Sequence, residues 1–472
     1  MRALSRRKLF GGAKSAEGPK SPKTLIRGAD VLTMDTAGEL LRTDVLIEGD
    51  RIVQIGVGLP SDDADIVEAE GMILMPGLID GHRHTWETPM LGELVKTEPR
   101  RYSTYLQFNN QKVGVCYRPE HVYLGNLLGG LTMIDAGVTS VLDQAHVIHT
   151  PEKGDAAARG LKESGIGGVF CYQLTHTPSY GPGSTVPAAQ AWAEFTAPAD
   201  EWHLREAAVV RDAYFSDGAG PLQFGVGLSG TALGPDRDMA SIIWEFEQAR
   251  ALRPKIMTQH NNHVTHLNEA GLLGPDLHMS HGTEASAEDL RLMAEHGVKL
   301  CSTTMGEYAY VEPQIHGRAR AAGVDVGIGM DVPLTLNSDF FEHVRNAFWS
   351  LYRSEDGMRL ADAYDATKVL EFATSLGAKA IGMGDETGSI KIGKRADLVL
   401  LRTDRIGFAS LGSLADRVVN FATKQDVDCV WVAGALRKQD GQMIGVDWRS
   451  YRQPVLEMQE YVLSQAATIT FT

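Results

Sequence analysis

Cysteine is scarce in this chain and never occurs in closely spaced pairs. The four copies are Cys116, Cys171, Cys301 and Cys429. They lie far apart, include no CxxC motif and match no disulfide framework. We therefore expect reduced thiols, which are typical of an enzyme in the cytoplasm.

Long apolar runs are missing as well. No segment approaches the roughly 20 consecutive apolar residues that a bilayer-spanning helix needs, so no membrane partner is expected. The segment Ser5-Arg6-Arg7 resembles the start of a twin-arginine export signal. Residues 11–23, however, hold three lysines, one glutamate and two prolines where such a signal needs an apolar stretch. The sequence therefore favours a cytoplasmic protein and leaves open whether Ser5-Arg6-Arg7 is a relic of an export signal.

The chain has fewer positively charged than negatively charged residues. The chain has 45 lysines and arginines against 60 aspartates and glutamates, which gives a formal net charge of −15. A nucleic acid or an anionic membrane would require a basic surface on its partner. The charge balance therefore argues against both and places no restriction on a small neutral substrate.

The chain is rich in apolar residues and glycine. Its 472 residues are 43% hydrophobic and 22% charged, which permits a sizeable buried core. Fifty glycines suit a fold that closes many short strand-to-helix turns. This length suits one large barrel with a smaller appended domain.

The apolar pattern divides the chain into four parts. Residues 1–23, rich in Lys, Gly, Ser and Pro, predict a disordered tail. Residues 24–76 and 386–445 hold short strand-like runs, such as Arg51–Gly56 and Gly388–Gly393, and predict a small β-sandwich domain built from both chain ends. Residues 446–472 predict a helical tail with a helix around Pro454–Ser464.

Residues 77–385 alternate strand-like and helix-length runs. The strand-like runs include Gly167–Tyr172 and Val324–Gly329, and the amphipathic ones include Ala287–His296. Such alternation predicts a parallel sheet with covering helices. About eight units suggest a closed (β/α)8 TIM-type barrel, an α/β fold.

The sharpest motif is Pro-Gly-Leu-Ile-Asp-Gly-His-Arg-His, residues 76–84. Side chains two positions apart on a strand point the same way, so His82 and His84 can together bind one cation at the barrel mouth. Three more strand-like runs end in His260, His281 and Asp331. Barrel enzymes carry their catalytic groups at such strand ends. Four of these sites in one barrel predict a metal centre.

These residues, in this order, resemble the amidohydrolase superfamily. The resemblance extends to Gly-Ser-Ile-Lys-Ile-Gly-Lys-Arg-Ala-Asp, residues 388–397, and to Val-Trp-Val-Ala-Gly, residues 430–434. It covers nearly everything from Thr24 to Gly445. It implies a metal-dependent hydrolase that acts on small molecules and forms a homo-oligomer.

The resemblance also implies a ligand set. Binuclear members carry a carboxylated lysine at the end of the fourth strand, but Gly167–Tyr172, interpreted as that strand, is followed by Gln173. A single divalent ion is therefore expected, as in the group that contains triazine hydrolase and cytosine deaminase. The implied ligands are His82, His84, His260 and Asp331. Such a set suits Zn²⁺ best and also admits Fe²⁺, Co²⁺ or Mn²⁺.

The implied chemistry is hydrolysis by water activated on the metal. In this scheme His281 polarises that water and stabilises the developing charge. Asp331 takes up the proton and passes it to the leaving nitrogen.

The chain departs from the ring-deaminating relatives at the fifth strand. Those relatives carry His-x-x-Glu, whereas this chain has His260-Asn-Asn-His263. It therefore resembles more closely the amidohydrolases that cleave urea, carbamate or thiocarbamate bonds, such as phenylurea hydrolases and molinate hydrolase. Candidate substrate-binding residues are His263, Gln173, His146, Glu307 and Trp86.

Two alternatives stay open. The first is an aminohydrolase, a deaminase or dehalogenase, acting on a nitrogen heterocycle such as a purine, a pyrimidine or an s-triazine, with His263 in place of the missing glutamate. The second is a non-catalytic scaffold that has lost its metal. The complete set of predicted ligands argues against the second.

Overall fold

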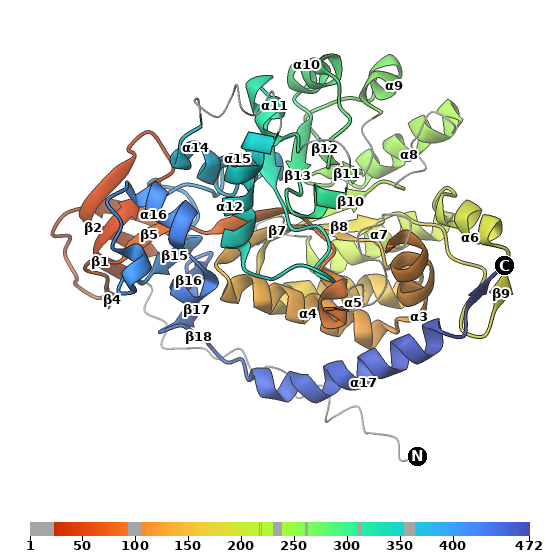
Figure 1. Ribbon diagram of the computed structural model, residues 1–472, viewed down its shortest axis with the longest axis horizontal. Helices are drawn as coiled ribbons and strands as arrows, with labels where there is room; N and C mark the ends of the chain where they lie inside the picture. Colours follow the sequence, from red (N-terminus) through yellow and green to blue (C-terminus); the bar gives the residue numbers. More distant parts are fainter. Residues whose placement is uncertain are drawn as a thin grey trace.

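The protein is described from a computed structural model that covers residues 23–92, 105–216, 218, 220–229, 238–259, 263–309, 314–353 and 364–472. A barrel lies at its centre and a second sheet at one end (Figure 1). The predicted disordered tail lies outside the described residues, except that Lys23, assigned to it, begins strand β1 (Lys23–Leu32).

Eight parallel strands form the barrel, as predicted. In chain order they are β6 (Leu78–Arg83), β7 (Val138–Ala145), β8 (Gly167–Gln173), β10 (Leu222–Gly227), β11 (Met257–Gln259), β12 (Leu277–Ser280), β13 (Lys299–Ser302) and β14 (Val326–Ile328). Each strand pairs with the next along the chain. A parallel bridge between Arg83 and Asp331 joins the first strand to the segment after the eighth, so the sheet nearly closes.

One strand number in the sequence interpretation is wrong. Gly167–Gln173 is the third barrel strand, because β6 and β7 precede it in the barrel. The fourth strand is Leu222–Gly227, with the sequence LQFGVG. It also lacks a lysine, so the argument against a bridging carboxylated lysine holds for the corrected strand.

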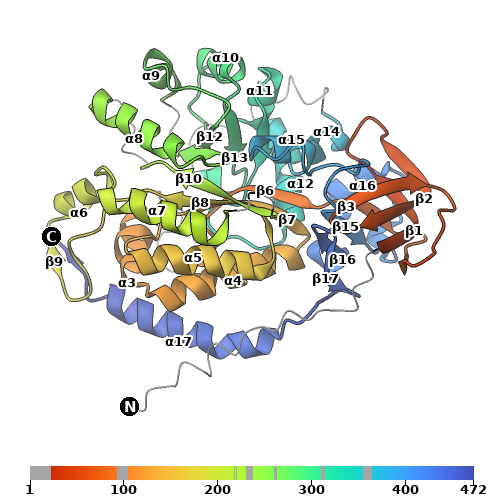
Figure 2. The same cartoon turned by 180° about the vertical axis from the view of Figure 1, so that it is seen from behind.

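Helices cover the outside of the barrel (Figures 1 and 2). They are α4 (Pro119–Asp135), α5 (Pro151–Ser164), α6 (Ala188–Phe195), α7 (Glu201–Tyr214), α8 (Met239–Ala251), α9 (Val264–Glu269), α10 (Ala287–His296), α11 (His316–Ala321), α12 (Phe340–Ser350), α14 (Ala366–Glu371) and α15 (Ser375–Ala380). Helix α10 has its predicted bounds because Ser286 and Asp289 form a capping box and Gly297, with φ 69°, ends the helix.

The second sheet combines strands from both chain ends. Its order is β18 (Gln442–Met443), β17 (Ala435–Gln439), β16 (Val427–Val432), β15 (Leu398–Leu401), β5 (Ile73–Pro76), β1, β2 (Glu39–Glu48) and β3 (Arg51–Gly56), with β4 (Asp65–Glu68) paired to β1. The red and blue strands therefore lie side by side at one end of Figure 1. Helix α16 (Leu414–Phe421) packs beside them.

The strand expected at Gly388–Gly393 is absent from this described part of the chain. Gly388 and Gly393 have φ of 84° and 91°, so the backbone turns at both ends of the segment. Ile392 is 60% exposed although its neighbour Ile390 is buried. The apolar alternation here marks a turn anchored by Ile390, not a paired strand.

A C-terminal helix and strand run along the outside of the barrel. Helix α17 (Trp448–Ala466) is longer than the predicted Pro454–Ser464 and lies along α3 (Gly114–Cys116) and α4 (Figures 1 and 2). Strand β19 (Thr470–Phe471) then pairs with β9 (Thr185–Val186), in the connection between β8 and α6. No helix in the described ranges is long and apolar enough to cross a membrane.

Candidate metal centre

The first barrel strand is anchored so that its two histidines face the mouth. The carboxylate of Asp80, two residues before His82, accepts the main-chain N–H of Met330 at 2.9 Å, which ties β6 to the end of β14. Gly329 lets these backbones approach, because a Cβ there would lie 2.6 Å from the His82 nitrogen. Asp80 of the motif and Gly329 after β14 therefore hold the ends of these two strands together at the site.

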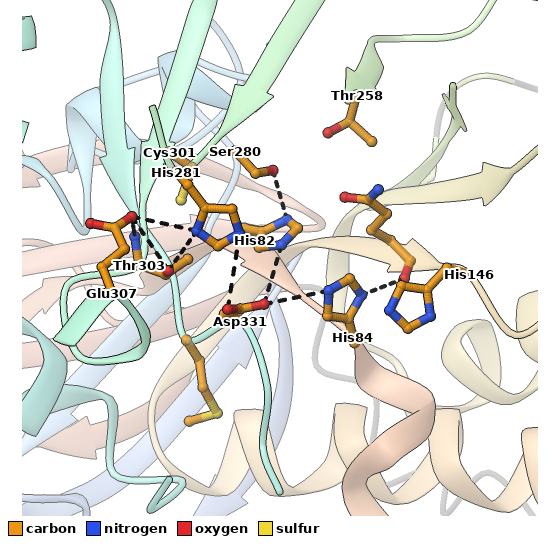
Figure 3. Close-up of polar contacts among 12 residues, drawn as sticks. His82, His84, His146, Thr258, Ser280, His281, Cys301, Thr303, Glu307 and Asp331 are labelled. Atoms are coloured by element: carbon orange, nitrogen blue, oxygen red, sulfur yellow. Dashed lines mark hydrogen bonds and ion pairs between the residues drawn. The ribbon is translucent and has the colours of Figure 1, made fainter. Parts of the chain in front are cut away.

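Three imidazoles converge on the Asp331 carboxylate (Figure 3). His84 Nε2 lies 3.4 Å and His82 Nε2 lies 3.5 Å from Asp331 Oδ1. His281 Nε2 lies 3.9 Å from Asp331 Oδ2. The structure thus brings together the predicted side chains from strands one, six and eight.

The other nitrogen of each ring is held by a neighbour. His84 Nδ1 donates to the main-chain oxygen of Gln144 at 3.0 Å, because a carbonyl can only accept. In its neutral form the His84 ring therefore carries its lone pair on Nε2, toward Asp331. His82 Nδ1 lies 2.9 Å from Ser280 Oγ, and His281 Nδ1 lies 2.9 Å from Thr303 Oγ1. Such partners orient histidine ligands in metalloproteins.

This donor set fits a divalent metal. Ligand atoms of His82, His281 and Asp331 lie within 4.8 Å of one another, and all three residues are buried. Imidazole nitrogens with one carboxylate are the ligands that Zn²⁺ and similar ions prefer.

Backbone strain coincides with the site. His281 and Asp331 both have positive φ, 73° and 70°, which is costly for residues other than glycine. Strained residues of this kind gather at functional sites, where the surrounding structure holds them in place.

The electrostatics of the cluster follow from burial among opposite charges. Burial opposes ionisation of Asp331, yet His281, His82 and His84 hold the pKa of its carboxyl well below the usual range. Burial lowers the pKa of His82 to about 4. Burial also acts to lower the pKa of His281, but Asp331 and Glu307 raise it overall.

Glu307 lies behind His281. It is fully buried at η5 (Gly306–Ala309), and its Oε1 lies 3.5 Å from His281 Nδ1. It accepts the Thr303 N–H at 2.6 Å and the Ser302 hydroxyl at 2.8 Å. Glu307 was predicted to bind substrate, but the structure places it against His281 and not among the residues that line the neighbouring cavity.

His146 belongs to a directional hydrogen-bond chain. The Trp86 indole N–H can only donate, and it donates to His146 Nδ1 at 3.1 Å. The His146 proton therefore sits on Nε2, 3.2 Å from the Tyr105 hydroxyl, which donates to Glu87 Oε1 at 2.7 Å. Trp86 is 1% exposed and contacts His146 without lining the cavity.

A cavity opens beside the predicted metal ligands, at the ends of β7 and β8. Gln144, His146 and Gln173 line it, together with apolar side chains that include Leu106, Leu174 and Phe195. Two predicted substrate-binding residues, Gln173 and His146, are therefore in this cavity. His263, at the start of α9 with φ 27°, does not line it. His260 lies outside the described residues.

Sequence reasoning missed the residues that hold the histidines in place. Ser280 and Thr303 are small hydroxyl residues at strand ends, and Tyr105 lies in a segment, η3 (Tyr105–Val113), without a recognisable motif. Gln144, two residues before His146, was not among the predicted site residues. The position of Ser280 directly before His281 was the one available signal.

The chain is similar to known proteins in sequence and in fold. A model of the amidohydrolase family matches residues 248–437. The chain is 25% identical over 447 residues to 5'-deoxyadenosine deaminase of Methanosarcina mazei, a match that covers 90% of this chain and 94% of that one. It is 26% identical over 435 residues to 5-methylthioadenosine/S-adenosylhomocysteine deaminase of Desulforudis audaxviator, which covers 90% and 95%.

Solved structures share the fold. An adenosine deaminase from Xanthomonas campestris with bound zinc has a TM-score of 0.76 and 22% identity, over 93% of this chain and 98% of that one. Atrazine chlorohydrolase from Arthrobacter aurescens, complexed with zinc, has a TM-score of 0.73 and 18% identity, over 92% and 100%. The donor set described above and the match to the amidohydrolase family support a divalent metal here. The chain is similar to the amidohydrolase superfamily, and the family match together with the deaminase relatives supports a hydrolytic enzyme acting on carbon–nitrogen bonds.

Proposed function

We propose that the protein hydrolyses a carbon–nitrogen bond of an acyclic amide, urea, carbamate or thiocarbamate. His82, His84, His260 and Asp331 would hold one divalent ion, with Zn²⁺ as the first choice. Such an ion supplies a Lewis acid and a water of lowered pKa.

Asp331 and His281 would supply proton transfer and charge stabilisation beside the ion. Asp331 directs Oδ1 to His82 and His84, so its Oδ2, on the side of His281, is the oxygen placed to hold a proton and return it to the leaving nitrogen. His281, kept in place by Thr303 and Glu307, orients the attacking water and stabilises negative charge on the substrate oxygen.

The residues that line the cavity favour an acyclic substrate over a nitrogen heterocycle. Ring deamination needs an acid that protonates a ring nitrogen. Among the described lining residues Glu194 is the one carboxylate, and it accepts the N–H and hydroxyl of Ser179 at 2.8 and 2.6 Å and the Gln190 amide at 3.0 Å. These hydrogen bonds engage Glu194, so the rest of the described lining offers amide and imidazole groups instead of a carboxylic acid.

An aminohydrolase of nitrogen heterocycles is the second candidate. The relatives at 25% and 26% identity are named deaminases of adenosine-type nucleosides, and this favours a ring substrate. In that case His263, or a residue near His260, would have to supply the acid.

Metal analysis with product identification tests the proposal. We expect about one divalent ion per chain, lost in His260→Ala and kept in His296→Ala, a control at an exposed histidine on α10. The zinc-loaded enzyme should release amines from ureas or carbamates. Release of ammonia from purines or s-triazines alone would favour the second candidate. An intact fold without metal would favour the scaffold.

A further inference from the structure

Two glutamines at neighbouring strand ends form a hydrogen-bond relay with a fixed direction. Gln173 Nε2 donates to the main-chain oxygen of Leu228, which can only accept. Gln173 Oε1 must then face Gln144, and it accepts Gln144 Nε2 at 2.8 Å. The relay therefore settles which end of each amide is oxygen and which is nitrogen.

The relay ends in an acceptor that pairs with none of the residues that the structure describes. Both glutamines line the cavity beside the metal ligands, and Gln144 is 0% exposed. Among the described residues none donates to Gln144 Oε1. A buried polar atom without a hydrogen bond is destabilising, so its retention at a cavity wall indicates a ligand that donates to it.

The neighbouring backbone makes room for this arrangement. Gly227, at the end of β10, faces the Gln173 amide, and a Cβ at this glycine would lie 2.2 Å from Gln173 Oε1. The same Gln144 whose side chain ends the relay uses its main-chain oxygen to hold His84. The acceptor therefore sits next to the reacting centre, on a residue that also positions a ligand.

We propose that Gln144 Oε1 is a specificity-determining acceptor for an N–H of the substrate. The enzyme would take amides, ureas or carbamates that carry a hydrogen on the nitrogen bonded to the scissile carbonyl, and would reject their N-methyl analogues. This inference rests on the proposed function. It adds a chemical requirement that neither the motif nor the metal imposes.

Two probes that differ in this hydrogen test the inference: methyl N-phenylcarbamate and methyl N-methyl-N-phenylcarbamate. The zinc-loaded wild type is expected to prefer the N–H probe by about 10- to 100-fold, because the analogue leaves the acceptor unpaired. Preference is measured as the ratio of kcat/KM where an aniline is released, and otherwise as the ratio of Kd from calorimetry.

Gln144→Met should bring this ratio close to one, mainly by weakening the N–H probe. Its metal content should stay at the wild-type level, because the main-chain oxygen and not the side chain holds His84. Gln173→Met, a second variant, frees the Gln144 amide to turn and should lower the ratio as well. Gln223→Met is the matched control, because that glutamine binds Glu386 at 2.9 Å outside the cavity and should keep the wild-type ratio.

Each outcome decides a different point. A wild-type ratio near one, or a ratio kept in Gln144→Met as steric exclusion would give, overturns the inference while aniline release still supports the proposed function. A preference in binding that Gln144→Met abolishes, without release of any aniline, supports the inference and rejects the proposed reaction. Failure of both probes to bind overturns both.

Discussion

His84 and His146 stack face to face, with ring centroids 3.8 Å apart and an angle of 28° between the planes. One ring belongs to the metal cluster and the other to the chain of Trp86, Tyr105 and Glu87. Because Trp86 fixes the orientation of His146, the stack gives His84 a rigid wall on the side of the cavity. His146 is therefore a positioning residue for a metal ligand as well as part of the cavity lining.

His146→Ala is expected to weaken metal binding about tenfold, a typical effect of removing the support of a metal ligand. His146→Phe keeps a ring against His84 and should bind metal more tightly than His146→Ala. Competition with a chelator measures both affinities. Equal affinities in wild type and His146→Ala would show that the stack does not support His84.

Asp331→Asn removes the proposed proton carrier and keeps the shape of the side chain. We expect kcat to fall by a factor of about 10² to 10⁴, the range typical of a lost general acid–base. Metal content, measured by elemental analysis, should fall as well, because a neutral amide is a weaker ligand. A variant with full activity would exclude Asp331 from the reaction.

Glu307→Gln tests whether the carboxylate behind His281 acts through that histidine. The amide can still accept from Thr303, but it lacks the charge that raises the pKa of His281. We expect a lower kcat with KM and metal content near wild type, and an altered pH profile. A change confined to KM would instead support the original prediction that Glu307 contacts substrate.

Lys153 is the clearest pH-sensitive element of the fold away from the metal. It is 4% exposed, and its Nζ donates to the Gly114 carbonyl at 3.0 Å. Burial lowers its pKa from 10.5 to about 7. Between these values the unfolded chain binds a proton that the folded chain does not. Burial of Lys153 therefore destabilises the folded state fully below pH 7, and this destabilisation disappears as the pH rises toward 10.5.

Lys153→Met removes this protonation cost. Relative to wild type, the variant should gain about 3 kcal/mol more in free energy of unfolding at pH 6 than at pH 9.5, at 1.36 kcal/mol per pKa unit. Urea unfolding of both proteins at both pH values measures the difference. A difference that does not change with pH would contradict the pKa shift.

The sequence predicts those parts of the fold that local patterns encode. Alternating runs predicted the barrel, and the spacing of His82 and His84 predicted two rings on one side of a strand. Gly388–Gly393 shows the limit, because the alternation of Ile390 and Ile392 with polar residues fits both a strand and a turn. Only the positive φ of the two glycines distinguishes them.

Contacts between segments that lie far apart in the sequence could not be predicted from the sequence. Nothing near Gln144 indicates that Gln173 will orient its amide, since the bond depends on the register of β7 and β8. The numbering of the third strand failed for a related reason, because a short apolar run does not reveal how strands are counted around a barrel. The domain boundaries, the role of His263 and the homo-oligomer stay predictions.

The pairing of β9 with β19 has a consequence for synthesis on the ribosome. Tyr180 lines the cavity and packs edge-on against Phe471, with ring centroids 5.8 Å apart. Because chains emerge from the N-terminus, all eight barrel strands leave the ribosome before β19 does. A nascent chain can therefore assemble its barrel while this wall of the cavity still lacks its last strand. Substrate selectivity would then be acquired later than the fold itself.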